Sequence, residues 1–89
     1  MNRRVHVTIR GKVQGVFFRA AIGREAKKLK IKGWVKNTGD DVEALFEGTN
    51  ESIQELLEFC IVGSKDAKVT GMDIDELSYS GEFEEFRTE

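Results

Sequence analysis

Hydrophobic and polar positions change their period along the chain, and each change predicts a new element. Residues 4–10 alternate strictly between apolar and polar side chains, which is typical of a half-buried strand. From Arg19 onward the apolar positions recur every three or four residues, as they do along one face of a helix. This predicted helix ends among the lysines of residues 27–30, whose charges suit the negative end of a helix dipole. The pattern therefore predicts a strand and a helix, joined by the glycine-containing segment 11–18.

The middle of the chain predicts a hairpin followed by a second helix. Residues 31–37 alternate again, segment 38–41 has the composition of a turn, and residues 42–47 follow as the second arm of the hairpin. Thr49 is a candidate N-cap for the helix that follows, and Gly63 is placed to end it.

The last part of the chain predicts two further strands. The first covers residues 69–77, where Val69 and Met72 lie at positions of opposite parity, so a bulge or an edge location is expected. Residues 83–87 are expected to form a short extra strand. The order is then βαββαβ with a β tail. It predicts an α+β, ferredoxin-like split βαβ sandwich, with an antiparallel sheet and two helices on one face. Residues 1–89 are expected to form a single domain.

Charge is distributed very unevenly, although the net charge of the 89 residues is only −2. Residues 1–40 contain eleven Lys or Arg and two acids, whereas residues 41–89 contain three basic and fourteen acidic residues. Such asymmetry can mark an anion-binding segment. It is equally compatible with two halves that lie against each other and pair their charges once folded, which is what the predicted interleaving of strands favours.

Cysteine and histidine are too few for several classes of site. The chain has one cysteine, Cys60, and one histidine, His6, so an internal disulfide and a His- or Cys-rich metal site are not expected. The N-terminal residues lack the apolar run of a signal peptide, and no segment has the length of a membrane span. We therefore expect a cytoplasmic protein without metal, cofactor or membrane contact.

The segment from Gly11 to Phe18 is the most informative for function. Its glycines permit backbone conformations in which successive N–H groups converge on an anion, and the segment leads directly into a helix N-terminus. Arg19 stands at that entry and adds a planar, permanently charged fork. These features describe a phosphate cradle. An ordinary β–α connection with a solvated arginine is the alternative.

Two segments carry a family resemblance. The sequence Gly-Lys-Val-Gln-Gly-Val-Phe-Phe-Arg at 11–19 resembles the signature loop of acylphosphatases. Gly-Trp-Val-Lys-Asn-Thr at 33–38, followed by Val42-Glu43, resembles the second signature of that family. The separation of the motifs and the predicted element order agree with it as well, so the resemblance covers essentially the whole chain.

The resemblance implies hydrolysis of acyl phosphates, which are carboxyl–phosphate mixed anhydrides, to a carboxylate and inorganic phosphate without metal or cofactor. Arg19 and Asn37 take the catalytic roles, Arg19 binding the phosphoryl group and Asn37 orienting the attacking water. Inorganic phosphate is then expected as product and inhibitor, and a monomer suffices. The residues that contribute loop N–H groups for substrate binding are Gln14, Gly15, Val16, Phe17 and Phe18.

Two departures from the family pattern affect rate and specificity rather than reaction type. Phe17 occupies a position where family members mostly carry a small residue, so its ring is expected to crowd the loop or to line the acyl side of the pocket. The turn at 38–41 is one residue shorter than the common form, which bears on how firmly Asn37 is held.

Two other functions remain open at this level. One is a catalytically weak phosphate-binding or regulatory domain that keeps the cradle without turnover. The other is an RNA-binding module of the same architecture. The acidic segment 42–47 and its lack of the aromatic RNA-binding pattern argue against nucleic acid.

Overall fold

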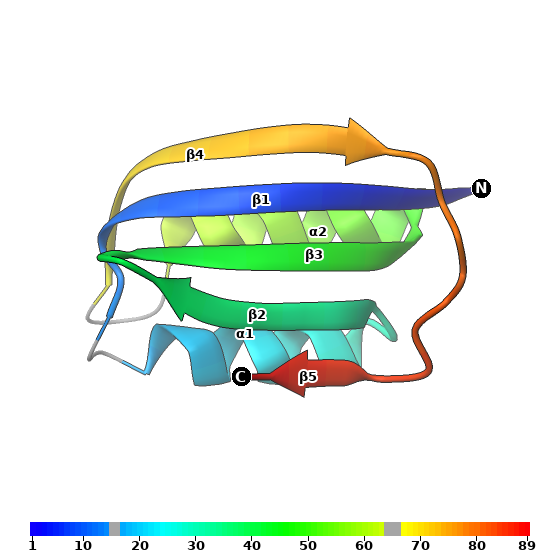
Figure 1. The fold of residues 1–89 in the computed structure, drawn as a ribbon, viewed down its shortest axis with the longest axis horizontal. Helices are drawn as coiled ribbons and strands as arrows, with labels where there is room; N and C mark the ends of the chain where they lie inside the picture. The colour runs from blue at the N-terminus through cyan, green and yellow to red at the C-terminus, as the bar shows by residue number, and fades with distance from the viewer. Residues whose placement is uncertain (15–16, 64–66) are drawn as a thin grey trace.

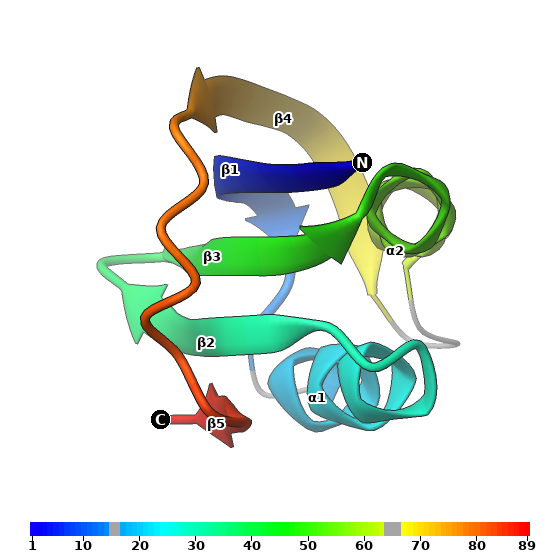
Figure 2. The same ribbon diagram turned by 90° about the vertical axis from the view of Figure 1, so that its right-hand side faces the viewer.

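The computed structural model of the protein describes residues 1–14, 17–63 and 67–89. In these residues a five-stranded sheet has two helices packed on one face (Figures 1 and 2). The strands lie in the order β4-β1-β3-β2-β5, which confirms the predicted ferredoxin-like split βαβ fold. The elements are β1 (Asn2–Lys12), α1 (Phe18–Lys28), β2 (Lys32–Thr38), β3 (Asp41–Thr49), α2 (Asn50–Val62), β4 (Lys68–Leu77) and β5 (Phe86–Thr88).

The C-terminal strand differs from the prediction in direction and length. β1 pairs antiparallel with β3 and β4, and β2 pairs antiparallel with β3, but β5 pairs parallel with β2. Figure 2 shows the reason: residues 78–85, which we call the strap, cross the side of the sheet opposite the helices before β5 begins. The strap therefore delivers β5 to the far edge of the sheet, and only Phe86–Thr88 remain to form the strand.

β4 contains the irregularity that its sequence predicts. Arg10 pairs with Gly71 and Gly11 pairs with Val69, so Thr70 is the extra residue of a β-bulge. β4 also forms one edge of the sheet. The predicted bulge and the predicted edge location are thus both present. The bulge accounts for the parity change, because it reverses the side to which the residues before it point.

The core lies between the helices and the face of the sheet that they cover. Strand residues on this face are fully buried because their alternation matches the pleat. Helix α2 begins where Thr49 Oγ1 accepts a hydrogen bond from the Ser52 N–H at 3.2 Å, as expected for an N-cap. The buried side chains of the core include Val5, Val7, Ile9, Ile22, Ala26, Val35, Val42, Ala44, Phe46, Ile53, Leu56 and Cys60.

On the opposite face, the strap is held by a buried carboxylate. Glu47 of β3 is only 3% exposed and accepts hydrogen bonds from the Ser80 N–H and Oγ, each at 3.1 Å. Arg4 of β1 lies 3.5 Å from Glu47 and 2.8 Å from Glu82. This set of contacts, which we call the clasp, joins two central strands to the strap and explains why a charged residue is buried here.

We expect removal of the clasp carboxylate to weaken the fold. Glu47→Ala leaves the Arg4 guanidinium without its buried partner and the Ser80 N–H without an acceptor, so the free energy of unfolding should fall by about 3 kcal/mol. Urea unfolding followed by circular dichroism measures this. Glu58→Ala on the exposed face of α2 is the control and should change it by less than about 0.5 kcal/mol. Equal effects of the two substitutions would contradict the importance of the clasp.

The charges of β1 pair with acids from the second half of the chain. Arg3 Nη2 lies 2.8 Å from Glu76 Oε1, and Arg10 forms hydrogen bonds with Asp73. These arginines lower the pKa of both carboxyl groups below their ordinary values, chiefly through the hydrogen bonds. For β1, internal pairing is therefore the correct interpretation of the charge asymmetry.

Candidate active site

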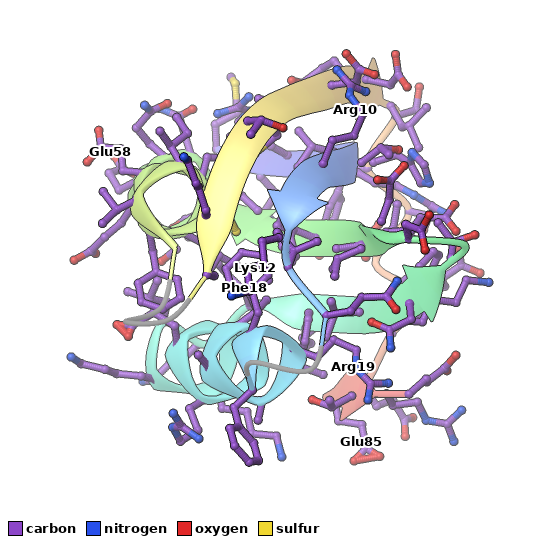
Figure 3. All side chains as sticks on the ribbon, turned by 90° about the vertical axis from the view of Figure 1, so that its left-hand side faces the viewer. Arg10, Lys12, Phe18, Arg19, Glu58 and Glu85 are labelled. Carbon is purple, nitrogen blue, oxygen red and sulfur yellow. The ribbon has the colours of Figure 1, made fainter. Side chains whose placement is uncertain are left out.

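Three segments that are distant in the sequence meet at one end of the molecule. The connection from β1 to α1 and the turn between β2 and β3 lie at the same end of the sheet (Figure 1). β5 runs beside β2 toward that end and brings the C-terminal residues to the first turns of α1 (Figures 1 and 3). The predicted loop, the predicted hairpin and the C-terminal strand thus form a common site.

The N-terminus of α1 presents main-chain donors to this site. Its N-cap residue, Phe17, has a left-handed backbone with φ 60°, and its carbonyl accepts the Ala21 N–H at 3.0 Å. In the part of the chain that the structure describes, no side chain caps the helix, and its first turn holds no acid. The first N–H groups and the positive end of the dipole are therefore available to an anion. Two predicted binding residues, Gly15 and Val16, lie outside the described residues.

Arg19 lies in the first turn of α1 and is anchored by the C-terminal segment. Its Nη1 donates a hydrogen bond to the main-chain oxygen of Glu89, and Figure 3 shows its side chain extending from α1 toward β5. One helical turn later, Gly23 allows this close approach, since a Cβ there would meet Thr88 Oγ1 at 2.3 Å. This hydrogen bond occupies one N–H group of the guanidinium, and its other N–H groups remain available to a ligand.

Asn37 approaches the same place from the sheet. It is the penultimate residue of β2, pairs with Val42 and is exposed. Within residues 1–14, 17–63 and 67–89 its side-chain amide makes no hydrogen bond. The amide of Asn37 is therefore free to bind a water or a substrate.

A cavity of about 290 Å³ unites these residues. It brings together five of the seven predicted site residues, and the other two are Gly15 and Val16. Thr88, which no sequence pattern pointed to, also contributes, because it reaches the site only through the docking of β5. The lining consists of Val13, Gln14, Phe17, Phe18, Arg19, Ala20, Asn37 and Thr88.

The two phenylalanines of the loop occupy opposite environments. Phe18 is 1% exposed, so its ring belongs to the core and what it offers the site is its main-chain N–H. Phe17 is 83% exposed and has a positive φ. Both the exposure and the left-handed backbone are unfavourable for a large apolar residue. Of the two expectations for Phe17, crowding of the loop by its ring is not observed, because the side chain is largely exposed to solvent. Phe17 does belong to the lining of the cavity, and contact of its ring with the acyl group of a substrate stays a prediction.

Other reactive groups lie elsewhere. Burial raises the pKa of the Cys60 thiol to about 12, so it stays protonated at neutral pH inside the core. His6 contacts Glu43 at 2.6 Å on the face of the sheet opposite the helices. Among the described residues, no three His, Cys, Asp or Glu side chains group closely enough to hold a metal ion. No helix there combines the length and apolar character that crossing a membrane requires.

Comparison with known proteins gives a consistent result. The sequence profile of the acylphosphatase family matches residues 5–88. The acylphosphatase of Methylococcus capsulatus is 47% identical over 85 residues, which is 94% of this chain and 92% of that protein. The acylphosphatase of Syntrophus aciditrophicus is 44% identical over 88 residues, covering 98% of this chain and 92% of that protein.

Solved structures agree with these relatives. An acylphosphatase from Coxiella burnetii superimposes with a TM-score of 0.93 at 37% identity, covering 99% of this chain and 93% of that one. The acylphosphatase from Bacillus subtilis gives a TM-score of 0.92 at 36% identity, with coverage of 99% and 98%. Because the family profile and these relatives extend over nearly the whole chain, and the pocket joins the residues of both signature motifs, this chain belongs to the acylphosphatase family.

Proposed function

We propose that this acylphosphatase cleaves carboxyl–phosphate mixed anhydrides with Arg19 and the N–H groups of residues 14–19 holding the phosphoryl group, while the Asn37 amide orients the attacking water. The observation that supports this most directly is the pocket itself. Arg19 from α1 and Asn37 from β2 line one cavity at the uncapped N-terminus of a helix. A bound phosphoryl group there meets a fixed positive charge, a helix dipole and a free amide.

The reaction needs little from the protein beyond position and charge. The water oxygen forms a bond to phosphorus, the bond from phosphorus to the acyl oxygen breaks, and its electron pair leaves with the carboxylate. A carboxylate is the base of an acid with a pKa of about 4, so no strong general acid is required. The proton of the water passes to a phosphoryl oxygen of the substrate. What remains for Arg19 and the loop is to stabilise charge on the equatorial oxygens, which requires no metal.

The same site accounts for the expected ligands. Inorganic phosphate, the second product, carries the oxygens that Arg19 recognises and should compete with substrate. We propose a monomer that acts on small molecules in the cytoplasm, without nucleic acid or membrane partners. The location is supported by a single, buried cysteine, which suits a reducing compartment.

A turnover assay tests this function. We expect the purified protein to hydrolyse benzoyl phosphate near neutral pH, and we expect the rate to be unchanged by a strong chelator. Release of phosphate and loss of the ultraviolet absorbance of the substrate both measure it. Phosphate binding without turnover would instead indicate the anion-binding domain, and loss of activity on chelation would overturn the metal-independent mechanism.

A further inference from the structure

Gln14 uses its side chain in a way that the sequence motifs do not indicate. Its Nε2 donates hydrogen bonds to the main-chain carbonyl oxygens of Gly39 and Asp41, at 2.6 and 2.8 Å. Gly39 lies in the turn between β2 and β3, and Asp41 begins β3. A residue of the loop before α1 therefore holds both sides of the tip of the hairpin that carries Asn37.

A count of donors shows what this contact excludes. A glutamine amide has two N–H groups, and both of them face carbonyl oxygens here. The orientation of the amide is determined by its partners, because the opposite orientation would place Oε1 against two other acceptors. While these bonds exist, the Gln14 side chain has no N–H left for a phosphoryl oxygen. Only its main-chain N–H remains available to the substrate.

The hairpin needs such a contact because its turn is short and lies at the end of the molecule. Thr38 pairs with Asp41, so only Gly39 and Asp40 form the loop, and Gly39 adopts a left-handed φ of 59°. A two-residue turn with glycine first fits this geometry. Asn37 lies just before this turn, so any rocking of the hairpin tip moves its amide relative to Arg19.

We propose that Gln14 is a positioning residue that ties the phosphate loop to the β2–β3 turn and so sets the position of the Asn37 amide over the phosphoryl group. This rests on the proposed function of Asn37 as the group that orients the water. Val13 supports the arrangement from the other side, since it is 1% exposed and anchors the start of the loop in the core. We call the two hydrogen bonds of the Gln14 amide the tether, and through them the position of Gln14, next to the buried Val13, is passed to the hairpin.

Kinetics on Gln14→Met test the tether. Methionine keeps the length of the side chain and removes both donors. We expect kcat to fall about tenfold, because small displacements of a positioning group are costly, while KM and inhibition by inorganic phosphate change by less than about twofold. Gln54→Met on the exposed face of α2 is the matched control and should leave kcat unchanged. A large rise in KM and weaker phosphate inhibition would overturn the proposal in favour of direct ligand contact.

A double-mutant cycle shows whether Gln14 acts through Asn37. In an Asn37→Ala background, Gln14→Met should lower kcat by less than about twofold further, since the group it positions is already gone. Losses that multiply fully would contradict the tether. Thermal unfolding of each variant establishes that the fold is intact.

Nuclear magnetic resonance separates this proposal from the proposed function. In Gln14→Met, the Asn37 side-chain amide resonances should shift and the main-chain amides of residues 38–41 should exchange faster with solvent, whatever the activity. If Asn37→Ala retains full activity, the water-orienting role fails, and the tether is decided by these spectra alone. Unchanged shifts and exchange rates at the hairpin would overturn it.

Discussion

Arg19→Ala should lower kcat/KM for an acyl phosphate by a hundredfold or more, which is the largest effect we expect of any single substitution. Among the residues that the structure describes, Arg19 supplies the only side-chain cation that lines the cavity. Its contact with the main-chain oxygen of Glu89 holds it in place before substrate arrives, so the proposed mechanism needs no reorganisation as charge develops on the equatorial oxygens. Steady-state kinetics with benzoyl phosphate measure the loss.

Two further variants make this prediction specific to the guanidinium. Arg19→Lys retains a positive charge but lacks the planar fork, so it cannot contact the main-chain oxygen of Glu89 and two phosphoryl oxygens in the same geometry, and most activity should also be lost. Arg24→Ala removes an exposed arginine of the same helix outside the cavity and should leave kcat/KM within about twofold. Full activity in Arg19→Ala, or equal losses in Arg19→Ala and Arg24→Ala, would contradict the assignment.

Asn37→Ala should lower kcat on the order of a hundredfold and change KM little. In the proposed mechanism its amide holds the attacking water in line with the bond that breaks, and this contact matters chiefly in the transition state. The same mechanism assigns binding of the phosphoryl group to Arg19 and the loop, which the substitution leaves intact. The comparison of kcat with KM at saturating and limiting substrate measures the effect.

The control for Asn37→Ala is an asparagine-to-alanine substitution outside the cavity. Asn2→Ala alters an exposed asparagine at the start of β1, at the opposite end of the strand from the cavity, and should leave both constants unchanged. A rise in KM with normal kcat in Asn37→Ala would indicate that the amide binds the ground state of the substrate. In that case another group must orient the water.

Much of the fold could be predicted because each element has its own local signal. Strict alternation in β1 places Val5 and Val7 on the buried face, and the parity change in β4 marks a real bulge. The direction of β5 could not be predicted in this way. It depends on the path of the strap, which is held by the buried Glu47 and by Arg4. A glutamate in a strand gives the same sequence pattern whether its side chain is solvated or buried.

The residues of the candidate site could likewise be predicted only in part. The motif residues Arg19 and Asn37 were identified from the sequence, and the structure brings both to one cavity. The contributions of Thr88 and Glu89 had no sequence signal, because they depend on a close approach between α1 and β5. Gly23 permits that approach, yet a glycine inside a helical pattern suggests on its own only a weaker helix.

The sequence by itself determined the order of strands and helices, the faces that form the core, and the residue types that a phosphate site requires. These follow from hydrophobic period, turn composition and the chemistry of loop and arginine, all of which act over a few neighbouring residues. Only the tertiary structure decided how those groups are held. Two contacts join residues far apart in the chain: the main-chain oxygen of Glu89 accepts from Arg19, and the Gln14 amide donates to the β2–β3 turn. Such contacts arise when packed elements bring distant polar groups within hydrogen-bonding distance, and no local pattern encodes them.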